Sequence, residues 1–165
     1  MLTVRTATER DLDAIILVNE AGRPHVASLD HRELQRLHSL GAQLFVAESS
    51  RASVRGYLIA FSHLHDYDAE EFQALRRRID CSFLYIDQVA VHPDVRRAGG
   101  GLLLYEAAHR FARIHNLEKL CCEVNLEPPN PRSLAFHEKA GFSPLGTLDV
   151  TDGRTVVLLA RDVRP

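Results

Sequence analysis

Two arginines and three consecutive glycines, in the stretch Arg96-Arg97-Ala98-Gly99-Gly100-Gly101, directly precede a leucine-rich run that is typical of a helix. Glycine at a helix start has an entropic cost, so its presence there needs a reason. The first N–H groups of a helix have no intrahelical partner, the helix dipole adds partial positive charge, and glycines let an anion approach closely. The stretch therefore indicates a phosphate-binding turn, with a simple flexible turn as the alternative.

The spacing of the glycines disfavours the two commonest nucleotide sites. A Walker P-loop needs Gly-Lys followed by Ser or Thr, which the chain does not contain. The dinucleotide pattern G-x-G-x-x-G would need a glycine at position 104, where Leu stands. The glycine spacing therefore disfavours both nucleotide hydrolysis and hydride transfer as the activity of this protein.

Length and composition are those of an ordinary globular protein. The chain has 165 residues, of which 45% are hydrophobic and 25% charged, with a formal net charge of -2. A chain of this size can bury roughly 70% of its unfolded surface, so we expect one domain. The small net charge gives no general attraction to nucleic acid or to an anionic membrane. Because the sequence shows neither a signal-peptide pattern nor a run of about 20 apolar residues, we expect a cytoplasmic location.

Cysteine and histidine spacing gives no support for a metal site. Cys81, Cys121 and Cys122 are odd in number and lack C-x-x-C spacing, which argues against a disulfide framework and a zinc site. We expect them to be small apolar core residues. His63, His65 and Asp66 lie close together but lack a further ligand at suitable spacing, so we expect no bound metal.

The hydrophobic pattern predicts a series of strands and helices. The strands are expected over residues 2–8, 43–49, 54–64, 83–91, 119–125, 143–150 and 155–163, and the main helices over 11–22, 29–40 and 102–116. A short helix opens at Asn130-Pro131 and ends at Gly141, and residues 65–80 form a short helix or a loop. Because a helix separates strands 83–91 and 119–125, they should run parallel. The sum is a mixed sheet with helices on both faces.

Two motifs in order carry a family resemblance. The pattern Arg/Gln-x-x-Gly-x-Gly/Ala is met by Arg96, Gly99 and Gly101 after a strand ending in VAVHPDV, and about thirty residues on comes NPRSLAFHEKAGF. The second segment is similar to N-x-x-[AS]-x-x-[FL]-[YH]-E-K-x-G-F. The chain thus resembles, over nearly its whole length, the GNAT superfamily of acetyl-CoA-dependent N-acetyltransferases. This resemblance implies the acyl-CoA N-acyltransferase fold, an α/β (α+β) architecture with a mixed, mostly antiparallel central sheet of about seven strands, in a single domain over residues 1–165.

The resemblance implies acetyl-CoA as co-substrate, held by the backbone. The pyrophosphate would bind the amides of about 97–102, and the pantetheine arm would pair like an extra strand near 89–91. Arg96 and Arg97 either contact phosphate or are merely solvated. The implied cofactor-binding residues are Val89, Ala90, Val91, Arg96, Arg97, Ala98, Gly99, Gly100, Gly101, Leu102, Asn130 and Phe136.

Acyl transfer from a thioester to an amine needs a base for the amine, a donor for the oxyanion, and an acid for the departing thiolate. Many members of the family place a tyrosine acid in the second motif, where this sequence has His137. An imidazole with an ordinary pKa of ~6.5 can protonate a thiolate near neutral pH. His137 either does so or only packs on the cofactor, in which case Tyr85 or Tyr105 is the substitute.

Asp87 is the favoured base. Strand alternation puts Tyr85, Asp87 and Val89 on one face and Gln88 on the other. Family members often keep a base just upstream of the pantetheine-binding segment. The alternative for Asp87 is an ion pair with one of the arginines at 76–78.

The acceptor is expected to be a primary amine of a small molecule or a peptide. The resemblance implies an acceptor cleft walled by about residues 19–29 and 150–155. Asp66, Asp68, Glu70 and Glu71 either lend this cleft negative potential that attracts a cationic amine or form a solvated acidic surface. A non-catalytic acyl-CoA-binding module is the competing function. We expect no nucleic acid or membrane partner, and a homodimer is left open.

Overall fold

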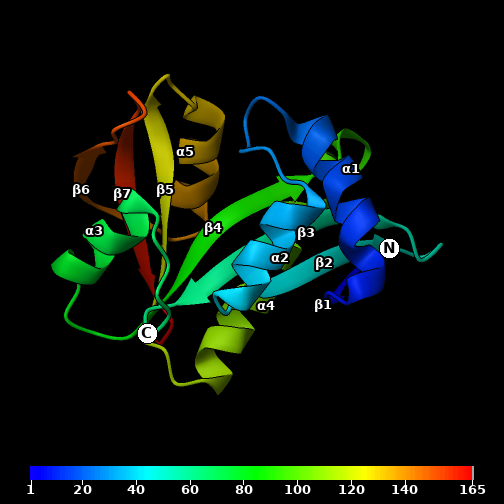
Figure 1. Ribbon diagram of the computed structural model, residues 1–165, viewed down its shortest axis with the longest axis horizontal. Coiled ribbons are helices and arrows are strands. Elements are labelled where there is room, and N and C mark those ends of the chain that lie inside the picture. The colour runs from blue at the N-terminus through cyan, green and yellow to red at the C-terminus, as the bar shows by residue number, and fades with distance from the viewer. Residues whose placement is uncertain (165) are drawn as a thin grey trace. The chain divides into compact units, whose positions relative to one another are not determined.

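The computed structural model describes residues 1–164 and contains a seven-stranded sheet with the order β1-β2-β3-β4-β5-β7-β6 (Figure 1). The strands are β1 (Leu2–Thr6), β2 (Gln43–Ser49), β3 (Val54–Ser62), β4 (Phe83–Val91), β5 (Lys119–Glu127), β6 (Ser143–Asp149) and β7 (Thr155–Asp162). The helices are α1 (Leu12–Gly22), α2 (His31–Ser39), α3 (Glu70–Arg78), α4 (Gly100–Ile114) and α5 (Pro131–Lys139). Short 3₁₀ turns at Glu9–Asp11 and Pro93–Ala98 precede α1 and α4.

The sheet is mixed and mostly antiparallel, as predicted. Strands β4 and β5 run parallel, with Phe83 opposite Lys119 and Tyr85 opposite Cys121. The pairs β1–β2, β2–β3, β5–β7 and β6–β7 are antiparallel. Residues 65–80, for which the sequence left a choice between helix and loop, contain helix α3. None of the helices in the described residues has the length and apolar character needed to cross a bilayer.

The chain forms two compact units. The first comprises residues 1–61 and 86–111, and the second comprises residues 62–85 with the chain from 112 onward. Strand β4 belongs to both, because residues 83–85 lie in the second unit and 86–91 in the first. The single domain expected over residues 1–165 stays a prediction.

In the first unit, adjacent residues of β3 show that helices cover both faces of the strands. The Tyr57 hydroxyl bonds to Asn19 of α1. A Cβ built on the neighbouring Gly56 would lie 3.3 Å from the Leu104 side chain of α4. Since successive side chains of a strand point to opposite faces, α1 and α4 lie on opposite faces of β3. Figure 1 shows α1 and α2 in front of these strands and α4 behind them.

In the second unit, aromatic side chains join α3 to β4. The Phe72 ring lies 6.0 Å from that of Phe83 and 5.6 Å from that of Tyr85. Both Cys121 and Cys122 of β5 are buried, as predicted, whereas Cys81 is only partly so. Burial raises the pKa of Cys121 to about 12, so this thiol is protonated at neutral pH.

A buried carboxylate fixes the entry into α1, at the capping-box pattern that the sequence shows. Asp11 accepts hydrogen bonds from the Thr8 backbone N–H at 2.7 Å and from two nitrogens of Arg5 at 2.8 and 2.9 Å. The Arg5 guanidinium holds the pKa of Asp11 well below its ordinary value, against the opposing effect of burial. The carboxylate therefore links β1 to the start of the first helix.

We predict that Asp11→Asn lowers the free energy of unfolding by about 1–3 kcal/mol, because buried donors lose a charged acceptor. Partial solvent exposure of Arg5 favours the lower half of that range. Folding lowers the pKa of the Asp11 carboxyl, so on acidification the unfolded chain takes up this proton before the folded chain does. The stability that Asp11 contributes is therefore lost as the pH falls below about 4. Urea unfolding between pH 3 and 7 measures both effects.

The matched control is Asp13→Asn on the same helix. The Asp13 side chain is 87% exposed and faces only His31 at 2.8 Å, so its loss should change stability by less than about 0.5 kcal/mol. Equal effects of the two substitutions would contradict the role assigned to Asp11.

Candidate active site

The glycine turn joins β4 to α4 in the first unit, and two of its glycines are required for different reasons. Gly99 has a φ of 76°, in the left-handed region, with open space where a Cβ would lie. Gly100 begins α4, and a Cβ there would come within 3.1 Å of a Val91 methyl carbon. Backbone conformation explains the first glycine and close approach of the helix to β4 explains the second.

This arrangement fits a phosphate group. The Leu103 N–H donates to the Gly99 carbonyl at 3.0 Å, so the N–H groups of residues 100–102 precede the first intrahelical bond of a 15-residue helix. The glycines at 99–101 carry no side chain beside these donors, Gly99 is exposed and Gly100 is buried. The helix dipole adds positive potential at this end of α4. The residues expected to hold the CoA pyrophosphate therefore form a suitable anion cradle.

Arg96 connects this cradle to the end of the strand. Its Nε donates to the Val91 carbonyl at 3.2 Å, and both Arg96 and Arg97 are exposed. The sequence left a choice between phosphate contact and solvation for these arginines. The Val91 bond ties the Arg96 guanidinium to the end of β4.

A buried polar cluster lies between α1 and β4 in the first unit. The Asn19 side-chain amide donates to the Ala27 carbonyl at 2.8 Å and to the Tyr57 hydroxyl at 2.9 Å, and its oxygen accepts from the Leu29 N–H at 3.0 Å. The Gln88 amide also donates to the Ala27 carbonyl, at 3.1 Å. These bonds fix the connection between α1 and α2, which the family resemblance makes one wall of the acceptor cleft.

Asp87, the expected base, lies beside this cluster. It is half-buried in β4, next to Gln88, which accepts a short hydrogen bond from Tyr57. Burial raises the pKa of Tyr57, and the charge of Asp87 contributes in the same direction, although the bond to Asn19 opposes it. The Asp87 carboxylate thus lies near enough to the Tyr57 hydroxyl to affect its ionisation.

Tyr85 in the second unit is part of a buried pair. Its hydroxyl donates to Glu123 Oε2 of β5 at 2.7 Å, and its ring is fully buried. Glu123 is half-buried and was not among the residues singled out from sequence. The sequence pattern that could have pointed to Glu123 is weak. Glu123 alternates with Cys121 and Asn125 along a strand whose other residues are typical of a core.

His137 is held by its own helix. Nδ1 lies 2.7 Å from the Ser133 carbonyl oxygen, which can only accept, so Nδ1 carries the proton. The ring packs edge-on against Phe136 and Phe142, both at 5.3 Å. Burial lowers the pKa of His137, outweighing the bond to Ser133, which raises it. An imidazole whose lowered pKa keeps it neutral is poorly suited to be an acid at pH 7.

Asn130 caps the same helix, as the sequence predicts. Its side-chain oxygen accepts from the Ser133 N–H at 3.3 Å. Phe136 is half-buried against His137. The helix cap therefore explains why the second motif begins with asparagine, without a contact to a ligand.

The four carboxylates of the acidic segment divide into an exposed pair and a pair that is bonded within the second unit. Glu71 is buried and pairs with Arg154 at 2.8 Å, and Glu70 accepts from the Thr151 hydroxyl at 2.6 Å. Only Asp66 and Asp68 of the four carboxylates are exposed. Sequence could not reveal these partners, because they lie about 80 positions apart in the chain.

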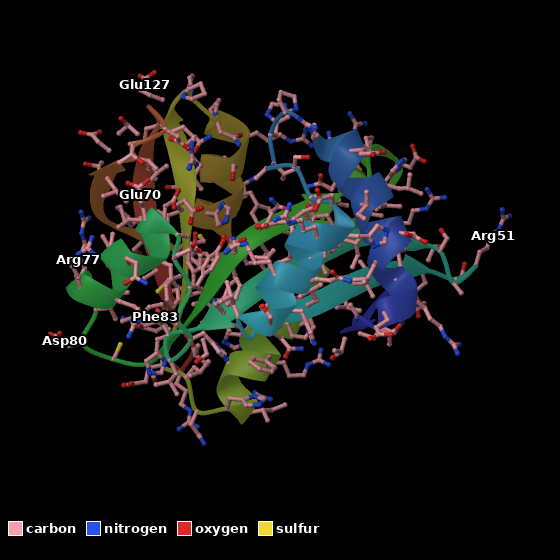
Figure 2. The ribbon with its side chains drawn as sticks, viewed as in Figure 1. Arg51, Glu70, Arg77, Asp80, Phe83 and Glu127 are labelled. Carbon is pink, nitrogen blue, oxygen red and sulfur yellow. The ribbon has the colours of Figure 1, made fainter. Side chains whose placement is uncertain are left out.

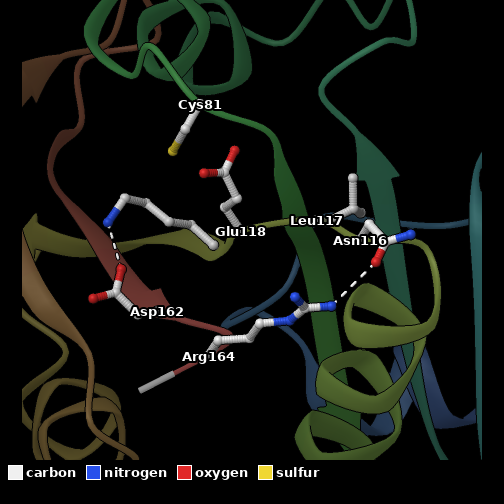
Figure 3. A pocket seen from close by; sticks show the side chains of 7 residues that line it. Cys81, Asn116, Leu117, Glu118, Asp162 and Arg164 are labelled. Atoms are coloured by element: carbon white, nitrogen blue, oxygen red, sulfur yellow. Dashed lines mark hydrogen bonds and ion pairs between the residues drawn. The ribbon is translucent and has the colours of Figure 1, made fainter.

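Two hollows lie in the second unit. One, of about 350 Å³, is lined by Cys81, residues 116–119, Asp162 and Arg164 (Figure 3), where Lys119 pairs with Asp162 and Arg164 bonds Asn116. The other, of about 520 Å³, lies beside α5, β6 and β7. Neither contains a residue expected to be catalytic or to bind CoA. Within residues 1–164, no three His, Cys, Asp or Glu side chains are arranged to hold a metal ion.

Comparison with known families identifies the fold and its chemistry. The family model described as Acetyltransferase (GNAT) family matches residues 14–142, which include both motifs. The chain belongs to this acetyltransferase family. Membership of an acetyltransferase family favours catalysis over the non-catalytic acyl-CoA-binding alternative. No curated protein matches the sequence.

Solved structures agree on the fold. Ard1 from Thermoplasma volcanium has a TM-score of 0.76 at 20% identity, covering 99% of each chain. Ribosomal-protein-alanine N-acetyltransferase from Brucella melitensis has a TM-score of 0.70 at 23% identity, covering 96% of this chain and 98% of that one. The NatC complex bound to Gag peptide and CoA has a TM-score of 0.70 at 16% identity, covering 98% of each chain. The acetyltransferase thus has the acyl-CoA N-acyltransferase fold expected from its sequence.

For this acetyltransferase, we predict that His137 stays neutral at pH 6.5, with its proton on Nδ1. Its lowered pKa and the bond to the Ser133 carbonyl both favour that form. Two-dimensional ¹H–¹⁵N spectra of the imidazole, recorded between pH 5 and 8, distinguish the tautomers and follow the titration. An imidazolium at pH 6.5, or a proton on Nε2, would contradict the assignment and restore His137 as an acid.

Proposed function

We propose that this acetyltransferase moves the acetyl group of acetyl-CoA directly to a primary amine of a small molecule or a peptide. The observation that carries the proposal is the glycine turn at 99–101, where the N–H groups of residues 100–102 precede the first intrahelical hydrogen bond of α4. Family membership supports acetyl-CoA as the donor, and so does the NatC structure with bound CoA. One of the similar structures is named as a ribosomal-protein-alanine N-acetyltransferase and another is bound to a Gag peptide, which makes peptide amines the first acceptors to test.

In the proposed complex, the amides of residues 97–102 bind the pyrophosphate, and the backbone of Val89, Ala90 and Val91 pairs with the pantetheine arm. Arg96 and Arg97 supply positive charge beside the turn, and Asn130 and Phe136 lie at the start and middle of α5. Acetyl-CoA supplies an activated thioester carbonyl. These residues bind and orient it, which lowers the entropic part of the barrier.

The proton chemistry is assigned to Asp87 and Tyr85. Asp87 accepts a proton from the incoming ammonium, so that a neutral amine attacks. Tyr85, held by Glu123, is proposed as the donor to the departing thiolate, and His137 is proposed as a packing residue. Over the whole reaction the ammonium loses two protons, of which one ends on the CoA thiol and one enters solvent.

The location of the protein and its assembly are predictions from the sequence. A cytoplasmic location and the absence of nucleic acid and membrane partners stay predictions, drawn from charge and composition. A homodimer is left open.

The activity is tested by acetyl-CoA-dependent thiol release with a panel of alanyl and seryl peptides, spermidine, kanamycin and lysine. We expect at least one amine to be acetylated, with the product mass raised by one acetyl group. Stoichiometric CoA binding without thiol release on any amine would instead support a binding module.

We predict that Gly99→Val or Gly101→Val weakens CoA binding at least tenfold, or ~1.4 kcal/mol, because a side chain blocks or distorts the anion cradle. Calorimetry of the folded variants measures the change. Gly153→Val is the matched control: Gly153 also has a positive φ, of 94°, with open space for a Cβ, but lies in the β6–β7 turn. It should lose stability to a similar degree and keep its CoA affinity.

For the chemical step, we predict that Asp87→Asn and Tyr85→Phe each lower kcat by about 10²-fold or more, since general acid or base assistance is typically worth 10²–10⁴. His137→Ala should keep kcat within about threefold while lowering the melting temperature, because the ring fills a buried site. Thiol-release kinetics below the melting transition separate these effects. The reverse result, with His137→Ala inactive and Tyr85→Phe active, would return the acid role to His137; Tyr105→Phe is the next variant if both are active.

A further inference from the structure

Strand β6 is a free edge of the sheet. It is the last strand in the order β1-β2-β3-β4-β5-β7-β6, and among the described residues it pairs with β7 alone. Nearly all of its residues are exposed. An unpaired edge presents backbone N–H and C=O groups to which another strand can bond, so proteins protect such edges. The protection of β6 therefore decides whether copies of this chain can associate through it.

The first half of β6 has two local forms of protection. Pro144 has no backbone N–H, and the register with β7 shifts between Pro144 and Gly146. In the second half, residues 147–149 pair with β7 in regular register and include no proline. This half needs another form of protection if the edge is to stay unpaired.

The hydrogen bonds between β6 and β7 show which groups of the second half point to the free edge. Just beyond the strand, the Val150 N–H donates to the Arg154 carbonyl at 2.8 Å. Hydrogen-bonded and non-hydrogen-bonded pairs alternate along an antiparallel ladder. By this alternation Thr147, which lies opposite Val157, belongs to a non-hydrogen-bonded pair. The N–H and C=O of Thr147 therefore point away from β7, where a further strand would bond to them.

Arg78 already occupies this part of the edge. It is the last residue of α3, and its Nη2 donates to the Thr147 carbonyl at 3.0 Å. A Cβ built on Gly146 would lie 3.2 Å from Arg78 Nη1, so the glycine leaves room for the guanidinium beside the strand. The acceptor that a further strand would use is thus bonded to a cationic side chain.

Helix α3 holds Arg78 in this place. At the N-terminal end of the helix, Glu70 accepts from the Thr151 hydroxyl at 2.6 Å and from the Thr151 N–H at 3.2 Å. Figure 2 shows Glu70 and Arg77, the neighbour of Arg78, near opposite ends of the helix. The helix that carries the guanidinium is therefore anchored at its other end to the same β6–β7 hairpin.

The strand that fits this edge is β6 of a second copy. In an antiparallel pair centred on Leu148, Thr147 faces Asp149 of the second copy, and Asp149 faces Thr147 of the second copy. Because Asp149 is the one charged residue in the sequence of β6, no like charges face each other, and the contact is isologous. In that pair the Thr147 carbonyl accepts from the Asp149 N–H of the second copy, which is the bond that Arg78 replaces.

We propose that Arg78 blocks the free edge of β6, which would otherwise pair with β6 of a second copy. The guanidinium bonds to the acceptor that this pairing requires, and burial of its charge between two copies is unfavourable. The inference is independent of the acetyl transfer proposed above. It gives α3 a role in keeping this surface unpaired.

The test compares Arg78→Ala with Arg77→Ala by sedimentation equilibrium over a range of protein concentrations. We expect Arg78→Ala to self-associate at least about tenfold more tightly than wild type, because the Thr147 carbonyl is then open to a second copy. Arg77→Ala is the matched control, since it removes the same charge from the same turn of the helix and leaves the bond to Thr147 in place. Its self-association should match that of wild type.

Two further measurements locate the association at this edge. Adding Thr147→Pro to Arg78→Ala removes the N–H that the second copy needs, and a non-hydrogen-bonded position does not use that N–H for pairing with β7. The double variant should therefore return to the self-association of wild type. Hydrogen exchange at Thr147 and Asp149 should be slower in Arg78→Ala at high protein concentration than at low concentration.

Equal self-association of Arg78→Ala and Arg77→Ala overturns this inference. Association of Arg78→Ala that survives Thr147→Pro, with unchanged exchange at Thr147 and Asp149, also overturns it, because the copies then meet at another surface. Failure of the proposed acetyl transfer would alter neither result.

Discussion

Close packing between the first turn of α4 and the end of β4 is the constraint on which the rest of the site depends. Gly100 is so near Val91 that a Cβ would meet it at 3.1 Å. The chain must also reverse direction in a few residues, which the left-handed Gly99 permits. The first residue of α4 therefore lies beside Val91, the last residue of β4. In the proposed function, anion binding and backbone pairing with an amide-bearing arm use this one continuous segment.

Polar side chains fix one loop in each unit. Asn19 bonds the α1–α2 connection at two points, the Ala27 carbonyl and the Leu29 N–H. Arg154 does the same for the β6–β7 turn through Glu71 and Asn125. A buried polar group without a partner is costly, so each network has a strong preference for one loop conformation. Proteins with the same strands can differ in such loops, and so in the acceptor that they prefer.

Histidine at position 137 illustrates how local structure limits chemistry. Placed in the second motif, its reference pKa makes it a reasonable proton donor. In the structure, its Nδ1 proton is engaged by the carbonyl one helical turn earlier, and burial disfavours the charged ring. The same burial that makes the residue a good core element reduces its capacity to give up a proton at pH 7. Proton transfer is better assigned to carboxylate and phenol groups on the strands.

Sequence alone determined the order of strands and helices, the parallel β4–β5 pair, the cap at Asn130 and the glycine turn. These features are encoded by neighbours in the chain: hydrophobic period, capping residues and glycine spacing act over a few positions. Two motifs were enough to indicate the family, and the family match confirmed it. What the sequence could not give were contacts between distant positions. The Tyr85–Glu123 pair spans 38 positions and Arg154–Glu71 spans 83, so no local pattern reports them. Only the tertiary structure decided that the acidic segment braces a turn, because hydrogen-bond partners are selected by proximity in space.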